Sequence, residues 1–244
     1  MPPRPRTDPS ARTRKRILDT AERLFGERGV GAVSLRDINR TAGISQGVLH
    51  YHFGGRDMLV KAILERWLPS INADRRRMYD ALLASGRAPQ HRDIVEILCL
   101  PLAKLAIDRQ PAGRRFLRCL AKLHQEHSPL RSQVSDKYIA VPILEMLHEV
   151  APGASRSQIE WNLGMIMNVI HATLGDIGRP GQPWQAALNA TPMSPQEQVS
   201  ALVEFICDGV KALSVHVPDQ DPGRSFMRRP ASLPPSTENP DPVQ

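Results

Sequence analysis

The sequence is poor in cysteine and in long apolar runs, and each shortage excludes a class of protein. Its three cysteines, Cys99, Cys119 and Cys207, are scattered and odd in number, so they form neither a CxxC pair nor a disulfide framework. No run of about 18 apolar residues is present, so no segment is expected to cross a membrane. The basic N-terminus is not followed by an apolar stretch, which argues against a secretory signal. Together these features predict a reduced, cytoplasmic protein.

Motifs for catalysis are also missing. The sequence has no glycine-rich phosphate loop, no nucleophile elbow and no pair of carboxylates in an apolar setting. His124, Glu126 and His127 lie close together in the segment HQEHSPL, and its two histidines could in principle share a metal ion. This segment falls at the expected end of a helix, before a proline, where polar side chains more often cap the helix in water. We therefore predict that the protein is not an enzyme and holds neither a metal nor a cofactor.

The sequence does carry a concentrated excess of positive charge near its start. Residues 1–56 hold 11 Arg and Lys against five Asp and Glu, which gives +6 of the chain's net charge of +7. Residues 57–244 are nearly neutral, with 21 basic and 20 acidic side chains. Concentrated positive charge favours phosphate binding because it releases counterions from nucleic acid. The first quarter of the chain is therefore the predicted nucleic-acid-binding part.

The same region has the pattern of two short helices joined by a tight turn. Leu35 and Ile38 lie three residues apart and share one helix face. Gly43 supplies a position that is free to take a positive φ, and Ile44 and Leu49 then return to the same side to close a small core. This spacing is typical of a helix-turn-helix.

Serines mark the expected starts of both short helices. Ser34 stands at the N-cap of the first helix with Asp37 completing a capping box, and the side chain of Ser45 is expected to cap the second helix. Side chains on the outer face of the second helix can bond base edges, contact a thymine methyl group or hold phosphate oxygens. They are Gln46, Gly47, Val48, His50, Tyr51 and His52. The pattern predicts that this helix reads duplex DNA.

These residues resemble the DNA-binding pattern of the TetR family of bacterial transcription regulators. The resemblance covers roughly the first quarter of the chain and runs through Thr13, Arg14, Ile17, Ala21, Leu24, Phe25, Gly29, Ser34, Leu35, Ile38, Ala42, Gly43, Ile44, Ser45, Gly47, Leu49, Tyr51, Phe53, Arg56 and Asp57. Asn39 departs from the pattern, which has a small residue there, and His50 replaces an aromatic residue that holds a phosphate. The DNA contacts that pattern and resemblance imply are Thr13, Arg14, Ser34, Arg36, Ser45, Gln46, Gly47, Val48, His50, Tyr51, His52 and Arg56.

Apolar spacing and prolines predict further helices along the whole chain. We expect a first helix over Thr13–Glu27 and a fourth from near Gly55. Pro69 either bends this fourth helix, which then continues over Ser70–Leu83, or ends it. Five more are expected at Asp93–Asp108, Ala112–Glu126, Leu130–Glu149, Arg156–Asp176 and Pro195–Val217, and no convincing β pattern appears. The predicted fold is all-α with about nine helices. Its expected regions are a disordered basic arm (1–10), a helix-turn-helix domain (11–56), a helical effector-binding and dimerisation domain (57–217) and a disordered Pro-rich tail (218–244).

The last two predicted helices are apolar around more than one side. One face of each can cover the core while another pairs with a second copy of the chain, giving a homodimer through a four-helix interface, as the family resemblance also implies. The expected interface residues are Ile166, Ile170, Leu174, Leu202, Phe205, Ile206, Val210 and Leu213. Such a dimer would place two reading helices in successive major grooves of a near-palindromic operator.

The resemblance further implies a small-molecule site in the C-terminal domain. A bound effector would favour the conformation that cannot bind DNA, so that a repressor leaves its operator. The candidate lining residues interrupt apolar helix faces with polar or aromatic groups: Trp67, Phe116, Arg118, His124, Met165, Asn168 and His171. A dimeric DNA-binding regulator without a small effector, controlled by a protein partner or by concentration, is the alternative that the sequence leaves open.

Overall fold

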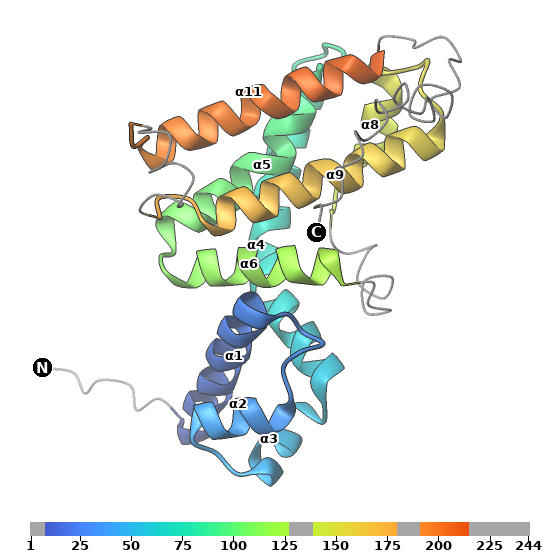
Figure 1. Ribbon diagram of the computed structural model, residues 1–244. Coiled ribbons are helices and arrows are strands. Elements are labelled where there is room, and N and C mark those ends of the chain that lie inside the picture. The colour runs from blue at the N-terminus through green and yellow to red at the C-terminus, as the bar shows by residue number, and fades with distance from the viewer. Residues whose placement is uncertain (1–7, 127–138, 180–190, 215–244) are drawn as a thin grey trace, which may run out of the picture.

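The computed structural model describes residues 8–126, 139–179 and 191–211, and the backbone of residues 212–214. Within these ranges the chain forms nine α-helices and no strand, which confirms the all-α fold class. A small head consists of α1 (Pro9–Arg28), α2 (Leu35–Ala42) and α3 (Gln46–Phe53). A larger body consists of α5 (His91–Asp108), α6 (Ala112–Gln125), α8 (Ile143–Val150), α9 (Arg156–Gly175) and α11 (Pro195–Ser214). The long helix α4 (Arg56–Ala84) runs from the head into the body (Figure 1).

Helix α1 begins one turn earlier than its apolar spacing predicts. The carboxylate of Asp8 accepts a hydrogen bond from the backbone N–H of Ser10 at 3.0 Å, and Pro9 occupies the start of the helix, where its missing N–H costs nothing. Residues 9 and 10, expected in a disordered arm, are therefore helical, while residues 1–7 lie outside the described ranges. Ile17 and Phe25, both fully buried, anchor the helix in the core of the head.

The capping box predicted for α2 is present. The hydroxyl of Ser34 accepts a hydrogen bond from the N–H of Asp37, and the carboxylate of Asp37 accepts one from the N–H of Ser34, each at 3.1 Å. Gly43 ends the helix in the left-handed conformation, with φ of 61°. Ser45 takes the N-cap position of α3, but its exposed side chain makes no capping hydrogen bond, so that part of the prediction is wrong. The Ser45 side chain therefore accepts no hydrogen bond from the first backbone N–H groups of α3. These groups must donate to solvent or to a bound partner.

Pro69 lies inside a helix, whereas Pro142 precedes the start of one. Helix α4 continues through Pro69, which removes one backbone hydrogen bond without ending the helix. The helix expected at Leu130–Glu149 is corrected: α8 begins only at Ile143, because Pro142 disfavours a helical residue before it, and residues 139–142 are not helical. Residues 127–138, most of the loop before α11 and the C-terminal tail lie outside the described ranges. The remaining body helices begin and end within one or two residues of their expected bounds, except that α11 is described only as far as Ser214.

The head and the body share a close helix contact. A Cβ atom added to Gly26 of α1 would meet the carbonyl oxygen of Arg115 and the Cβ of Arg118, both on α6, at 3.1 Å. In Figure 1, α6 lies between the head and the rest of the body. The lack of a side chain at Gly26 therefore allows α1 and α6 to approach each other closely.

Candidate nucleic-acid interface

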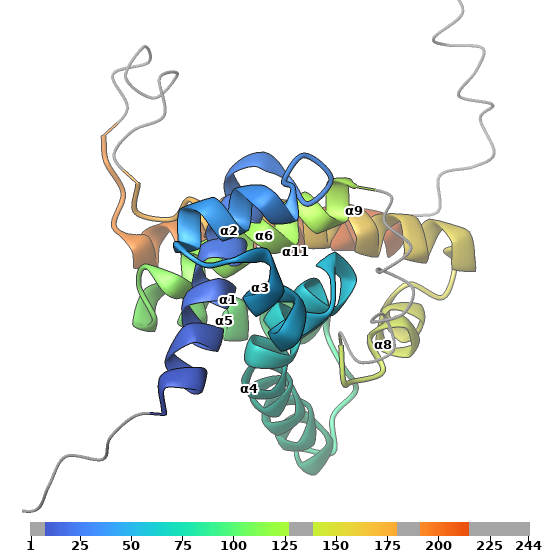
Figure 2. The ribbon, with the colours of Figure 1, turned by 90° about the horizontal axis from the view of Figure 1, so that it is seen from below.

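Helix α3 turns its apolar side chains inward and its polar side chains outward. Leu49 and Phe53 are buried in the head, whereas Gln46 and His50 are exposed. Tyr51 exposes 84% of its surface, which is unusual for a large aromatic side chain. Figure 2 looks onto this end of the molecule, with α2 and α3 in front. The outer side of α3 is thus available to a partner.

The start of α1 and the outer side of α3 line a shared hollow of about 460 Å³. Its lining residues are Pro9, Ser10, Thr13, Ser45, Gly47, Val48, Tyr51 and His52. Six of these eight residues are predicted DNA contacts, and the first turn of α1 adds Pro9 and Ser10, which the sequence analysis did not name. The hydroxyl of Thr13 donates a hydrogen bond to the carbonyl oxygen of Pro9 at 3.0 Å, within the same turn. Half of the twelve predicted DNA contacts therefore line one concave surface.

The arginines among the predicted DNA contacts differ in their surroundings. The guanidinium of Arg14 lies over the ring of Phe53, 5.1 Å from its centroid, while Arg36 is exposed on α2. Arg56 donates a hydrogen bond from Nη2 to the carbonyl oxygen of Val33 at 2.9 Å, which ties the start of α4 to the turn between α1 and α2. Arg56 thus has a structural role beside its predicted contact with DNA.

Asp37 organises the exposed side of α2. Its carboxylate accepts a hydrogen bond from the hydroxyl of Ser34 at 2.7 Å and pairs with Arg40 at 2.6 Å and with Arg28 at 3.9 Å. The hydrogen bonds from Ser34, and then the two cations, lower the pKa of Asp37 below its usual value. The hydroxyl of Ser34, a predicted DNA contact, is therefore already engaged within the head.

Four of the seven candidate effector residues meet inside the molecule as two ring pairs. Trp67 of α4 stacks on Phe116 of α6, with ring centroids 5.7 Å apart and planes at 29°. His124 of α6 meets His171 of α9 edge-on, with centroids 4.7 Å apart. Burial, reinforced by the nearby His124 and Arg75, holds the pKa of His171 well below its ordinary value of 6.5. His171 is therefore a neutral side chain near pH 7.

The other three candidate effector residues lie elsewhere. Arg118 joins α6 to the end of α9, because its Nε donates to the carbonyl oxygen of Gly175 at 2.9 Å and pairs with Asp176 at 3.2 Å. Met165 and Asn168 are exposed on α9. Sequence spacing places these three residues on helix faces. It does not show whether a given face points into the interior of the body.

A buried acid that the sequence analysis missed connects the head to the body. Glu22 of α1 is fully buried, and its Oε2 accepts a hydrogen bond from the indole N–H of Trp67 at 2.7 Å. Burial, the largest influence, raises the pKa of Glu22. Its position four residues after Leu18 and three before Phe25 puts it on the buried stripe of α1. An acid on such a stripe is a signal that the sequence alone contains.

Two further charged residues, Arg75 and Glu126, join segments that lie far apart in the sequence. Arg75 of α4, with only 1% of its surface exposed, donates hydrogen bonds to the carbonyl oxygen of Leu98 on α5 at 3.3 Å and to Asn72 at 3.4 Å. Glu126, just after α6, accepts a hydrogen bond from the N–H of Gly31 at 2.9 Å. Glu126 belongs to the HQEH segment, and here it holds the turn that precedes α2. No periodic signal in the sequence predicts that long-range contact.

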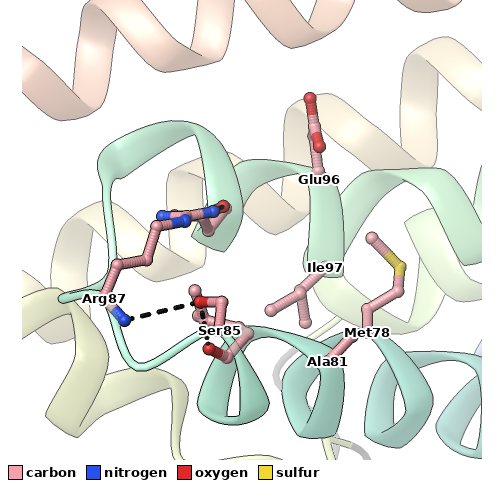
Figure 3. A pocket seen from close by; sticks show the side chains of 8 residues that line it. Met78, Ala81, Ser85, Arg87, Glu96 and Ile97 are labelled. Atoms are coloured by element: carbon pink, nitrogen blue, oxygen red, sulfur yellow. Dashed lines mark hydrogen bonds and ion pairs between the residues drawn. The ribbon is translucent and has the colours of Figure 1, made fainter.

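A second hollow, of about 290 Å³, lies where α4 ends and α5 begins (Figure 3). Its lining residues are Met78, Ala81, Leu82, Ser85, Arg87, Asp93, Glu96 and Ile97. The guanidinium of Arg87 holds the carboxylate of Asp93 through two hydrogen bonds of 2.5 and 2.6 Å, which lower the pKa of Asp93. None of the predicted DNA or effector residues lines this hollow.

The part of the chain that the structure describes offers neither a metal site nor a membrane span. There, no group of three or more His, Cys, Asp or Glu side chains is placed to hold a metal ion, and His127 lies outside these ranges. No helix of these residues is both long and apolar enough to cross a membrane. The three cysteines are buried as free thiols, and burial raises the pKa of Cys99 to about 12.

Two family models match the chain, one at the head and one in the body. Residues 17–63 match bacterial regulatory proteins of the tetR family, and residues 96–209 match the tetracyclin repressor-like C-terminal domain. The chain belongs to the TetR family. The first match spans the helix-turn-helix and the start of α4, and the second extends from α5 into α11. The resemblance seen in the first quarter of the sequence is confirmed and extends to the body.

Two curated relatives match this TetR-family chain over less than half of their own length. The HTH-type transcriptional repressor KstR2 of Rhodococcus jostii is 38% identical over 88 residues, which cover 35% of this chain and 41% of that protein. The HTH-type transcriptional regulator TtgR of Pseudomonas putida is 42% identical over 53 residues, which cover 22% of this chain and 25% of that protein. The solved structure of the ketosteroid transcriptional regulator KstR2 of Mycobacterium tuberculosis has a TM-score of 0.47 at 21% identity, covering 80% of this chain and 93% of that chain.

The dimer stripe expected for this TetR-family chain faces the core of its own protomer. The side chains of six expected interface residues are at most 9% exposed in the single chain: Ile166, Ile170, Leu174, Leu202, Ile206 and Val210. Phe205 is exposed at 70%, and the side chain of Leu213 lies outside the described residues. Trp161 and Met165 of α9 are exposed at 71% and 46%. Spacing identifies apolar helix faces, but it does not reveal which face the chain's own helices cover.

Proposed function

We propose that this chain is a sequence-specific, DNA-binding regulator of transcription. The observation that carries the proposal is the concave surface where the outward side chains of α3 meet the first turn of α1. This surface belongs to the segment 1–56, which holds +6 of the net charge of +7. Gln46 and His50 can bond base edges while the surrounding cations attract phosphates. Membership of the TetR family supports the same assignment.

We further propose that the chain acts as a homodimer through the outward face of α9 and α11. This face carries Trp161, Met165 and Phe205, and large exposed apolar side chains of this kind mark interaction surfaces. A twofold axis between two copies would present two α3 helices to successive major grooves, which calls for a near-palindromic operator.

The regulatory part of the proposal is that the protein represses transcription until a small molecule binds in the body. Its support is the pair of ring contacts inside the molecule, Trp67 with Phe116 and His124 with His171. Trp67 also bonds Glu22 of α1, so a ligand that changes the α4–α6 arrangement would change the setting of the head. Such a ligand releases DNA only if it binds the DNA-incompetent conformation more tightly.

Selection of binding sites from a random-sequence duplex pool tests the DNA-binding proposal. We expect enrichment of a near-palindromic sequence whose half-sites are one helical turn, or a multiple of it, apart. Gln46→Ala should change the preferred bases, whereas Arg36→Ala should weaken binding to all duplexes alike. A wild-type protein that enriches no sequence at low ionic strength would contradict the proposal.

The effector proposal has its own experiment. A thermal-shift screen of a compound library identifies molecules that raise the unfolding temperature of the wild-type protein. We expect a stabilising compound to release the enriched duplex from the protein, and to lose its effect in a Phe116→Ala variant that still folds. Stabilising compounds that all leave duplex affinity unchanged would refute release by a small molecule.

A further inference from the structure

Glu22 lies where one helix of the head meets two other helices. Asp19 is its acidic neighbour on α1, α4 contributes Arg66 and Trp67, and α6 contributes Arg115. Arg66 pairs with Asp19 at 2.7 Å, and its Nη1 lies 3.7 Å from Oε2 of Glu22. One buried carboxylate of the head thus faces cations from α4 and from α6.

The polar groups at this junction are only partly satisfied. Oε1 of Glu22, Nη1 of Arg66 and Nε of Arg115 are buried and have no hydrogen-bond partner among the described residues. Buried polar atoms without partners are costly, and native structures keep few of them. The direct hydrogen bond from Trp67 to Oε2 of Glu22 is therefore important for holding the carboxylate in place.

Trp67 is itself fixed by the interior of the molecule. Its ring stacks on Phe116, which is fully buried, and the guanidinium of Arg66 lies over the same ring at 5.5 Å from the centroid. The direction of the indole N–H therefore depends on where Phe116 lies. The hydrogen bond from the indole N–H to Glu22 therefore links α1 to α4 and Phe116, in addition to the direct packing of α1 on α6.

We propose that Glu22, in its charged form, fixes the position of the head relative to the body through Trp67 and Arg66. Protonation of Glu22 weakens these contacts, so the position of the head is no longer fixed. The inference rests on the proposed function, because it concerns how the head is presented to DNA. A hydrogen bond to a carboxylate is about twice as strong as one to a neutral group, and a protonated Glu22 also loses its attraction to Arg66.

The groups that face Glu22 determine when it takes up a proton. They are Asp19 on α1, Arg66 and Trp67 on α4, and Arg115 and Cys119 on α6. Burial outweighs the two arginines and raises the pKa of Glu22 above the ordinary 4.5, so protonation begins at a higher pH than for a free glutamate. Glu27 is the matched control: it is an exposed acid on the same helix, paired with Arg23.

The fluorescence of Trp67 tests the link without DNA. The chain has three tryptophans, so Trp161→Phe and Trp184→Phe leave Trp67 as the single reporter. We expect its emission to change on acidification with a midpoint above 4.5, and we expect Glu22→Gln but not Glu27→Gln to remove that transition. A transition that is unchanged by Glu22→Gln would overturn the proposal.

Affinity for the enriched duplex tests the consequence for the head. At about pH 8 we expect Glu22→Gln to weaken binding about tenfold, as for the loss of a charge-assisted hydrogen bond, while Glu27→Gln changes it by less than about threefold. The ratio of wild-type to Glu22→Gln affinity should fall towards one as the pH decreases, because the wild type then also carries a neutral side chain. A ratio that stays constant with pH would show a merely structural role and overturn the proposal.

A second variant keeps the proposal testable if Glu22→Gln does not fold. Trp67→Phe keeps an aromatic ring against Phe116 and removes the N–H donor together with the second ring of the indole, so we expect at least the same loss of affinity at about pH 8. Affinity equal to that of the wild type would overturn the proposal. If the wild type enriches no duplex, the proposed function fails, whereas the fluorescence titration still decides whether Glu22 controls Trp67.

Discussion

Leu202 and Phe205 lie one turn apart on α11, yet changing each to aspartate should cause different failures. Leu202 is 6% exposed and belongs to the core of the protomer, whereas Phe205 is 70% exposed. Leu202→Asp therefore places a charge inside the single chain. Phe205→Asp places the same charge on the surface that we propose as the dimer interface.

The expected magnitudes follow from the area that each side chain covers. Covering the exposed part of Phe205 in a dimer would remove about 100–150 Å² of apolar surface per copy, or about 3 kcal/mol per copy at ~25 cal/mol/Å². Because side-chain ordering and imperfect packing reduce this gain, we expect Phe205→Asp to cost about 2 kcal/mol summed over both copies, which weakens the dimer roughly 30-fold. Leu202→Asp should instead cost more than about 4 kcal/mol of unfolding free energy, a large part of the total stability of an ordinary domain.

Sedimentation equilibrium together with circular dichroism separates the two outcomes. We expect Phe205→Asp to be a folded monomer at concentrations where the wild type is a dimer, and Leu202→Asp to lose helical signal or aggregate. Phe205→Leu, which keeps an apolar side chain, should remain dimeric. A Phe205→Asp protein with the dimer Kd of the wild type would refute the outward interface, and a folded Leu202→Asp monomer would refute the core position of Leu202.

Substitutions of Arg56, Gly26 and His171 provide three further tests. Arg56→Ala should lower the salt dependence of duplex binding by about one unit of slope and cost about 1 kcal/mol of unfolding free energy, because the carbonyl of Val33 loses its donor. A slope that does not change in fluorescence anisotropy would leave Arg56 a structural role only. Gly26→Ala should cost about 1–3 kcal/mol in urea unfolding, because its Cβ would meet α6 at 3.1 Å, whereas Gly47→Ala, with no atom within 4 Å, should cost little; equal midpoints would contradict this. Because the pKa of His171 is depressed, the unfolded chain takes up a proton that the folded chain refuses, so the unfolding free energy should fall as the pH drops below 6.5. His171→Gln should flatten that fall in denaturant titrations across this pH range, and an equal slope would argue against a neutral His171.

The head could be predicted from the sequence because its signals are local. The capping box of Ser34 with Asp37 and the left-handed Gly43 each involve residues within a few positions of one another. Ser45 shows the limit of such reasoning, since an N-cap residue can take the correct backbone conformation without its side chain bonding the helix. The positions of the body helices were predictable for the same local reasons, apart from the late start of α8.

The contacts between helices could not be predicted in the same way. Helices α9 and α11 are apolar on more than one face, and only the folded chain shows that Ile170 and Val210 turn inward while Phe205 turns outward. The hydrogen bond from Gly31 to Glu126 joins residues 95 positions apart, and no periodic pattern encodes it. Glu22 is an intermediate case, because its place on a buried stripe was visible but its partner Trp67 was not.

The acidic side chains of residues 8–56 help to explain where positive charge is left on the head. Each acid of residues 8–56 has a partner within the protein: Asp8 caps α1, Asp19 pairs with Lys15 and Arg66, Glu22 accepts from Trp67, Glu27 pairs with Arg23, and Asp37 accepts from Ser34 and pairs with Arg28 and Arg40. Helix α3 itself contains no acid, and neither do the residues that line the hollow between α1 and α3. Four of these five acids therefore pair with cations of the protein, whereas Asp8 caps α1. Arg14, by contrast, lies over the ring of Phe53 in α3, so a cation of the head stands beside this helix. An approaching polyanion meets little repulsion from a helix without acids, which supports α3 as the side that we propose to face DNA.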